Sequence, residues 1–157
     1  MFLFVKIKLM IVYLGADHRG FETKKYLKGI LEERGYKVFD LGAYKYQKDD
    51  DYPEFAAKVA KKVGQKNGGK GIVICGSGVG VDVVANKFKG VRSAFGLSEA
   101  QVKAARSDDD ANVLSLAADF TGKSKAAKLA LVFLNTRFKS VPRFRRRLKK
   151  ISAIENS

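Results

Sequence analysis

The residues of this chain best suited to chemistry lie in one short stretch, residues 75–80, which reads C-G-S-G-V-G. The thiol of Cys75 can act as a base or a nucleophile, and the hydroxyl of Ser77 follows two residues later. Glycine at every second position lets the backbone approach a ligand without Cβ clashes, so that N–H groups can converge on an anion. The stretch predicts a thiol base beside a cradle for an oxyanion, and the alternative is a plain turn with a buried cysteine.

The residues on either side of this stretch predict how it is held. Three apolar β-branched residues, 72–74, precede it and are typical of a strand buried on both faces. Val81, Val83 and Val84 follow it and suit the packed face of a helix that begins near Gly80. Free N–H groups and the helix dipole meet where such a strand, turn and helix join, and they favour negative charge there. The same field favours the thiolate form of a cysteine.

The remainder of the chain alternates between strand-like and helix-like patterns. Four more strands are expected at residues 11–15, 36–41, 91–95 and 112–116, and helices are expected to start near Phe21, Pro53, Ser98, Thr121 and Pro142. This alternation predicts a single doubly wound α/β domain, Rossmann-like, with a five-stranded parallel sheet and helices on both faces. Ligands bind such sheets at the carboxyl ends of the strands, so Asp17 and His18 are expected beside Cys75.

Composition narrows the functional class. The chain has 157 residues and a net charge of +15, and no Asp or Glu occurs between Phe120 and Ile154. Because no nucleic-acid motif accompanies this charge, solubility and attraction of small anions are favoured over nucleic-acid binding. One cysteine excludes an internal disulfide framework, and with one histidine it argues against a zinc site. A lone thiol suits a reducing compartment, so a cytoplasmic location is expected.

The first ten residues are apolar but are interrupted by Lys6 and Lys8. The run is too short for a membrane span and lacks a small-residue cleavage site, so neither an anchor nor a signal peptide is expected. Residues 1–9 are interpreted as an extension, either a non-native start or a continuation of the first strand. The domain itself is expected to cover residues 10–154.

Four local patterns occur in a fixed order: G-A-D-H-R-G-F at 15–21, D-Y-P at 51–53, C-G-S-G-V-G and A-N-K within 75–87, and N-V-L at 112–114. Together they resemble the ribose-5-phosphate isomerase B family, which also contains the galactose-6-phosphate isomerase subunits. The resemblance runs from Met10 to about Ile154. It implies a five-stranded parallel sheet, a homodimer or a tetramer with active sites at the subunit interface, and no metal or organic cofactor.

The implied activity is aldose–ketose isomerisation of ribose 5-phosphate and ribulose 5-phosphate through an enediolate, a step of the pentose phosphate pathway. By resemblance, Cys75 is the base that moves a proton between C2 and C1, and Ser77 helps to hold the enediolate oxygen. The backbone that shares this role belongs to Gly76, Gly78, Val79 and Gly80. Two alternatives stay open: isomerisation of another sugar phosphate, such as a hexose phosphate, or a non-catalytic paralogue that binds sugar phosphate or RNA.

The resemblance also implies the binding residues. Asp17 and Tyr52 are expected to contact sugar hydroxyls or the ring oxygen. His18 with Arg143 and Arg147 is expected to hold the phosphate, partly from the second subunit. Each has a simpler alternative, because Asp17 could cap the following helix, His18 could be a surface residue, and Tyr52 could be packing.

Some positions at or near the motifs depart from the family pattern or need separate comment. Asp108 stands where relatives carry a histidine credited with opening the sugar ring, and Asn112 follows it as a further expected substrate contact. Asp119 stands where relatives often carry a phosphate-binding arginine, and a carboxylate there repels phosphate unless it is paired. Phe144 replaces a histidine on the last helix. Of the aspartates at 49–51, Asp51 is the one most expected to matter.

Overall fold

The computed structural model describes residues 9–157 and contains one five-stranded sheet in which all strands are parallel. The strand order is β2-β1-β3-β5-β4. The strands are β1 (Ile11–Ala16), β2 (Lys37–Asp40), β3 (Lys70–Cys75), β4 (Ser93–Phe95) and β5 (Val113–Ala117). The chain leaves β1 toward one side for β2 and returns to the other side for β3, so strand order reverses between β1 and β3.

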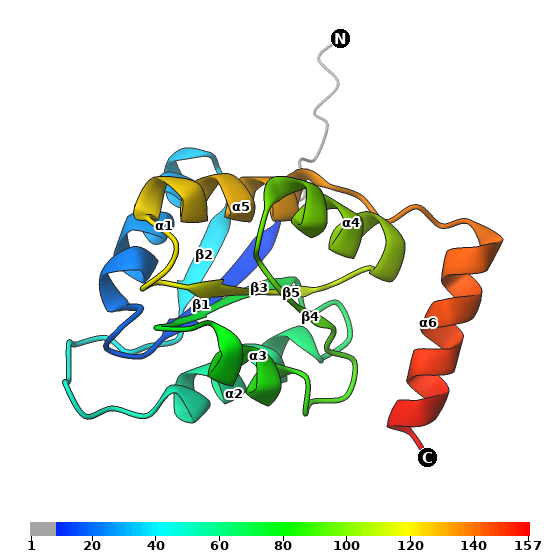
Figure 1. The fold of residues 1–157 in the computed structure, drawn as a ribbon, viewed down its shortest axis with the longest axis horizontal. Helices are drawn as coiled ribbons and strands as arrows, with labels where there is room; N and C mark the ends of the chain where they lie inside the picture. The colour runs from blue at the N-terminus through cyan, green and yellow to red at the C-terminus, as the bar shows by residue number, and fades with distance from the viewer. Residues whose placement is uncertain (1–8) are drawn as a thin grey trace, which may run out of the picture.

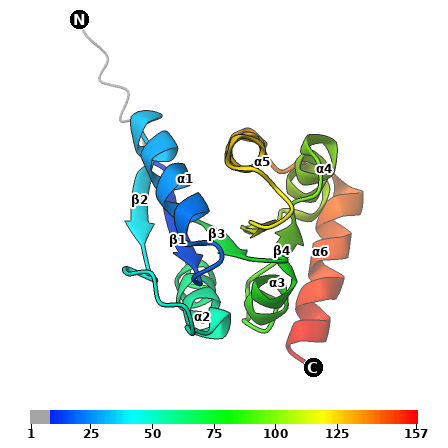
Figure 2. The same ribbon diagram turned by 60° about the vertical axis from the view of Figure 1, so that its left-hand side comes forward.

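Helices cover both faces of the sheet. They are α1 (Phe21–Glu33), α2 (Tyr52–Val63), α3 (Val79–Ala85), α4 (Glu99–Asp109), α5 (Lys123–Asn135) and α6 (Pro142–Glu155). Figure 1 shows α1, α4 and α5 on one face and α2 with α3 on the other. In both views α6 stands beside α4, outside these layers (Figures 1 and 2). The predicted single α/β domain with a five-stranded parallel sheet is confirmed.

Alternation along the central strand divides the core between the two faces. Ile72 and Ile74 belong to the cluster under α1, α4 and α5, whereas Val73 and Cys75 belong to the cluster under α2 and α3. All five residues of β5 are buried. Continuous apolar strands of this kind form because both faces lose water when helices pack on them.

Local sequence signals fixed most helix ends. Ser98 accepts a hydrogen bond from the N–H of Gln101, which is the predicted cap of α4. The side chain of Gln101 in turn accepts from the N–H of Leu97, one residue before the N–H that a capping box uses. Gly35 follows the C-cap of α1 and has a φ of 84°. Pro53 lies in the first turn of α2. The predicted cap at Thr121 is wrong: α5 begins at Lys123 after Gly122, and Thr121 is buried.

Two expectations concern the amino-terminal region and membranes. The interpretation of residues 1–9 as an extension falls, apart from Leu9, outside the described residues. Within residues 9–157, no helix combines the length and the apolar character that crossing a bilayer demands.

Candidate active site

A pocket of about 350 Å³ opens at the carboxyl edge of the sheet, beside the reversal between β1 and β3. Its walls come from the β1–α1 turn, the start of α2, the β3–α3 turn and α3 itself. The lining side chains include Asp17, Arg19, Tyr52, Cys75, Ser77 and Val83. The structure therefore brings together the sequence-predicted residues Asp17, Tyr52, Cys75 and Ser77, because parallel strands place their following turns on one edge.

Cys75 is the last residue of β3 and is only 4% exposed. Its Sγ accepts a hydrogen bond from the backbone N–H of Gly78 at 3.2 Å. Gly78 has a φ of 72°, a left-handed conformation that suits glycine and turns its N–H back toward the sulfur. This bond fixes the position of the sulfur at the edge of the pocket, where it can act on a ligand.

The turn has fewer free backbone N–H groups for an oxyanion than the sequence predicted. The N–H of Gly78 is directed to Cys75 Sγ, and the N–H of Val79 is directed to Ser77 Oγ at 3.3 Å. Two of the turn's donors are therefore used within the turn. The side chain of Ser77 is exposed and borders the pocket, so its hydroxyl is the side-chain donor that this turn offers to a ligand there. The helix that follows is short, with seven residues.

Asp17 lies in the turn before α1, whose N-cap is Gly20 without a side-chain cap bond, so Asp17 does not cap that helix. Its Oδ1 accepts hydrogen bonds from the N–H groups of Arg19 and Gly20, which secures the turn before α1. The residue is 4% exposed and also lines the pocket. Burial raises the pKa of Asp17 above its ordinary value of 3.8, while the hydrogen bond from Gly20 and the nearby His18 act in the opposite direction.

His18 lies next to this pocket but faces the loop before α2. Its Nδ1 lies 2.8 Å from Asp50 Oδ1, and its backbone N–H donates to the same oxygen. The side chain of Asp50 is buried and paired, whereas Asp51 is exposed and its side chain makes no cap hydrogen bond. The expectation for Asp51 stays a prediction. Ligand atoms of Asp17, His18 and Asp50 lie within 4.8 Å of one another, and they are the side chains of the described region that could hold a cation.

The loop that carries Asp50 is anchored by a buried lysine. Lys24 on α1 is fully buried, and its Nζ donates to Asp40 Oδ1 at 2.8 Å and to the carbonyl oxygen of Ala43. Burial lowers the pKa of Lys24, and the hydrogen bond to Asp40 opposes that shift. The buried pair ties α1 to the end of β2, where the loop toward Tyr52 begins.

Arg19 is a pocket residue that sequence reasoning missed. It lines the pocket from the β1–α1 turn, and its guanidinium forms an ion pair with the carboxylate of Asp119 from the β5–α5 turn. Asp119 was expected to repel phosphate unless paired, and the structure pairs it. No signal in the sequence links the two residues, which lie a hundred positions apart in turns that follow different strands.

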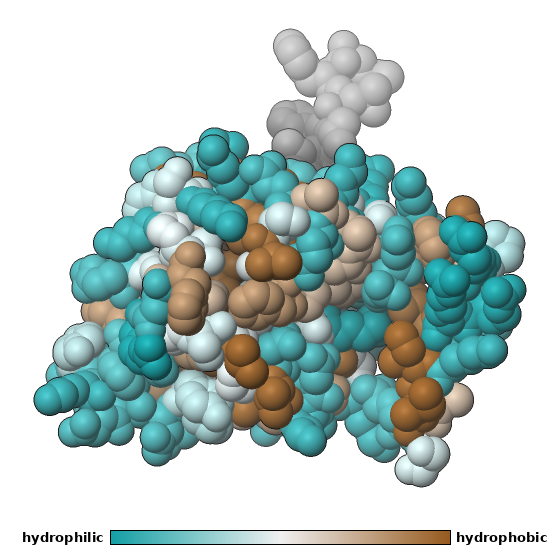
Figure 3. Space-filling model, viewed as in Figure 1, coloured by the Kyte–Doolittle hydropathy of each residue, from teal (hydrophilic) through white to brown (hydrophobic). Residues whose placement is uncertain are grey.

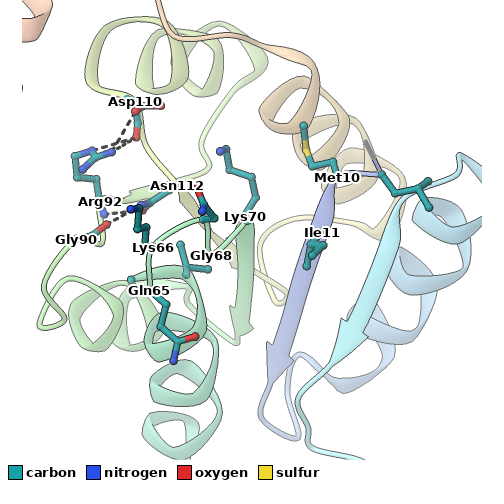
Figure 4. Close-up of a pocket in the computed structure, with 15 residues that line it drawn as sticks. Met10, Ile11, Gln65, Lys66, Gly68, Lys70, Gly90, Arg92, Asp110 and Asn112 are labelled. Carbon is teal, nitrogen blue, oxygen red and sulfur yellow. Dashed lines mark hydrogen bonds and ion pairs between the residues drawn. The ribbon is translucent and has the colours of Figure 1, made fainter. Parts of the chain in front are cut away.

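Asn112 does not line this pocket in its own protomer, and its expected substrate contact stays a prediction. It precedes β5 and therefore lies at the amino edge of the sheet, where it accepts from the N–H of Arg92 and donates to the carbonyl of Gly90. Figure 4 shows these contacts in a pocket of about 510 Å³. Asp108 lies at the end of α4 on the same side, with Oδ1 2.5 Å from Ser107 Oγ.

The two expected phosphate ligands on α6 also lie away from the pocket. Arg143 and Arg147 are exposed, and their guanidinium carbons stand 5.1 and 6.0 Å from the ring centre of buried Phe144. Figure 1 places α6 on the opposite side of the molecule from the carboxyl ends of the strands. One protomer therefore holds the thiol and the arginines of α6 in two separate places.

Comparison with known proteins decides the family. A family model described as Ribose/Galactose Isomerase matches residues 12–151. The chain belongs to this family. A probable ribose-5-phosphate isomerase B of Mycoplasma genitalium is 42% identical over 146 residues, covering 92% of this chain and 95% of the relative. The ribose-5-phosphate isomerase B of Mycolicibacterium paratuberculosis is 34% identical over 148 residues, or 94% of this chain and 93% of that protein.

Solved structures of the ribose-5-phosphate isomerase B family share the whole fold. The crystal structure from Mycoplasma genitalium with bound ribulose-5-phosphate has a TM-score of 0.90 at 39% identity, covering 94% of this chain and 97% of that chain. The Trypanosoma cruzi type B enzyme also has a TM-score of 0.90, at 32% identity and with the same coverage. The predicted family and the Rossmann-like fold are thereby confirmed.

Proposed function

We propose that this protein is an aldose–ketose isomerase that interconverts ribose 5-phosphate and ribulose 5-phosphate. Family membership and the named activity of its relatives support the reaction class. The observation that carries the proposal is the buried thiol of Cys75 at the carboxyl end of β3, in one small pocket with Asp17, Tyr52 and Ser77. A single free thiol also suits the reducing cytoplasm, where we infer that the protein works.

The reaction needs one base that works on both sides of an enediolate. The thiolate of Cys75 takes the proton from C2 of the open-chain aldose, and the electrons shift to the C1 carbonyl oxygen to form the enediolate. The resulting thiol returns the proton to C1, and the proton of the C2 hydroxyl passes to the C1 oxygen. C2 thereby becomes the ketone and C1 the hydroxymethyl group, so no oxidant or reductant is consumed. The hydroxyl of Ser77, which borders the pocket, donates to the enediolate oxygen, and a preorganised donor of that kind lowers the barrier.

Asp17 and Tyr52 have the positions needed to orient the sugar. Asp17 is fixed by two backbone N–H groups, so its remaining acceptor capacity can meet a sugar hydroxyl without rearrangement. Tyr52 is the first residue of α2 and lines the same pocket, with its side chain partly exposed. Rigid groups that hold the reacting carbons near the thiolate contribute through proximity.

We infer that the working form is a homodimer in which each pocket is completed by the second copy. The residues expected to hold phosphate or open the ring, Arg143, Arg147 and Asp108, lie far from the pocket of their own protomer. Exposed apolar side chains lie both beside the pocket and on α6. Val79 and Val83 on α3 border the pocket, and Ile151 and Ile154 are exposed on α6. Figure 3 shows hydrophobic patches over α3 and over the lower part of α6, which a second copy would cover.

An isomerase assay against a panel of sugar phosphates tests the activity. Ribose 5-phosphate should be converted by the wild type, and a six-carbon phosphate should be converted more slowly. Conversion of only a hexose phosphate would move the substrate assignment to that sugar. Absence of turnover on every member of the panel would reject the isomerase proposal.

A mixing experiment tests the shared site separately. Cys75→Ala and Arg147→Ala each impair every site of their own dimers. If the site is shared, a hybrid dimer holds one site with both defects and one intact site, so mixing and re-equilibrating the two inactive proteins restores activity. If each protomer is complete by itself, Arg147 takes no part in the site. Arg147→Ala then keeps its activity, and the mixture shows no gain over the average of its two components.

A further inference from the structure

Arg19 lines the Cys75 pocket, and the reaction proposed above gives its side chain no role. Its guanidinium lies directly on the β3–α3 turn, because a Cβ built on Gly76 would stand only 2.2 Å from Arg19 Cζ and Nε. Any side chain at position 76 would therefore push the guanidinium away. The bare backbone at Gly76 thus makes room for Arg19 beside the catalytic turn.

Both partners of the Arg19–Asp119 ion pair are fixed by backbone hydrogen bonds. The N–H of Arg19 donates to Asp17 Oδ1 at 3.0 Å. On the other side, the N–H of Asp119 donates to the carbonyl of Gly76 at 3.0 Å. Three turns that each follow a strand are thereby tied together around one guanidinium, which limits where it can point.

The charges around the pocket indicate which ligand group this guanidinium can bind. Among the described residues that line the pocket, Arg19 carries the basic side chain and Asp17 carries the acidic one. A sugar phosphate brings close to two negative charges, which a pocket containing Asp17 alone would repel. His18 is turned to Asp50, and the arginines of α6 belong to a distant part of the same protomer.

The ion pair itself is open to competition by a ligand. The side chains of Arg19 and Asp119 are 53% and 37% exposed, and ion pairs in such positions add little to stability. A guanidinium has five N–H donors in a planar fork, so it can hold Asp119 with one edge and a phosphate with another. The pair therefore pre-orients Arg19 without consuming all its donors.

We propose that Arg19 binds the phosphate group of the substrate and that Asp119 positions its guanidinium for that contact. The identification of the anion as a sugar phosphate rests on the proposed function. The contact is formed equally with substrate and transition state, so it acts on binding and not on proton transfer. Position 19 is thereby a residue that determines the preference for phosphorylated over neutral sugars.

Steady-state kinetics on two Arg19 variants and one control test this role. Arg19→Ala should raise the KM for ribose 5-phosphate about ten- to a hundredfold, the size expected for loss of a hydrogen-bonded charge contact. Its kcat should change by less than about threefold, because uniform binding is lost. Arg19→Lys keeps the charge but not the fork and should fall between Arg19→Ala and the wild type. Arg34→Ala removes one exposed arginine at the end of α1 and is the matched control.

Inhibition by inorganic phosphate supplies the second readout. Its inhibition constant should rise in Arg19→Ala in parallel with KM and should stay at the wild-type value in Arg34→Ala. Unchanged KM and inhibition constants in both Arg19 variants would overturn the inference. A fall in kcat with an unchanged KM would also overturn it, because Arg19 would then act on the reacting carbons.

A failure of the proposed function gives a different result. If the wild type shows no isomerase activity, titration calorimetry with inorganic phosphate decides the role of Arg19 by itself. Phosphate binding by the wild type that is lost in Arg19→Ala would keep the anion site and reject only the isomerase. Equal heats for both proteins would reject the anion site.

Discussion

Both edges of the sheet carry charged side chains but use them differently. At the amino edge, Arg92 donates to the carbonyls of Asp109 and Asp110, and Arg106 donates to the carbonyl of Ala111 and to the carboxylate of Asp110. At the carboxyl edge, Cys75, Ser77 and Arg19 border a small pocket with part of their hydrogen-bonding capacity turned toward it.

The difference shows what separates a structural polar network from a site. At the amino edge, the polar groups close the α4–β5 connection on itself, so they stabilise the fold and have little left for a ligand. At the carboxyl edge, the turns after β1, β3 and β5 fix one another through backbone bonds and leave side chains free. Charge density alone does not identify the site, whereas the remaining hydrogen-bonding capacity does.

The largest expected effect comes from the carboxyl edge. Cys75→Ala should lower kcat about 10²–10⁴-fold, because positioned proton transfer contributes that much. Thermal unfolding should show that the protein stays folded, and calorimetry should show that sugar phosphate still binds. Cys75→Ser serves as the conservative control and should also be slow, since a hydroxyl is a far weaker base than a thiolate. Turnover near the wild-type rate in either variant would make Cys75 a packing residue.

The amino edge should respond in stability and not in catalysis. Asn112→Ala removes the hydrogen bonds to Gly90 and Arg92 and should lower the free energy of unfolding by about 1–3 kcal/mol. Denaturant unfolding measures this loss, and kcat/KM per folded molecule should stay close to that of the wild type. A raised KM without a loss of stability would place Asn112 in the site after all.

Asp17 should make the stability of the folded protein depend on pH. Its pKa is raised in the folded state, so the ionised carboxylate opposes folding above that pKa, and the opposition disappears as pH falls through it. Asp17→Asn keeps an acceptor for Arg19 and Gly20 but has no charge. The variant should therefore melt at a higher temperature than the wild type at pH 7, and the difference should shrink on acidification. A difference that grows toward low pH would show that the carboxylate is stabilised.

The smallest effect is expected at Asp108. Its Oδ1 is held by Ser107 Oγ, and the side chain lies at the amino edge of its own protomer. Asp108→Asn should change kcat by less than about threefold, because we expect the enzyme to take mainly the open-chain substrate. Assays across pH 5–9 measure the effect. A large loss together with a shifted pH profile would show that Asp108 opens the sugar ring from the second subunit.

Much of the fold could be predicted because its signals are local. The apolar run at 72–74 marks the central strand, and Ser98 with Gln101 marks the start of α4, since each pattern acts over a few residues. The pocket residues Asp17 and Cys75 could be placed together because parallel strands share a carboxyl edge. The strand order, with β5 inserted between β3 and β4, could not be read from any local pattern.

The positions that no local pattern could predict depend on long-range contacts. Asn112 stands in a motif with site residues, yet it lies at the far edge because it precedes its strand, whereas Cys75 ends its own. Arg19 and Asp119 are a hundred positions apart in the chain, and no pattern links them. Asp50 and Asp51 are neighbours of the same type, and only the path of the loop decides which of them meets His18.

The sequence by itself determined the elements, the family and the chemical groups of the pocket, because helix and strand formation and motif identity depend on neighbouring residues. The tertiary structure alone decided that Gly76 leaves space for the Arg19 guanidinium, that Asp119 is paired, and that α6 stands apart from the pocket. These facts arise where separate turns meet in space. Their geometry is set by the packing of β1, β3 and β5, which no single segment of the chain encodes.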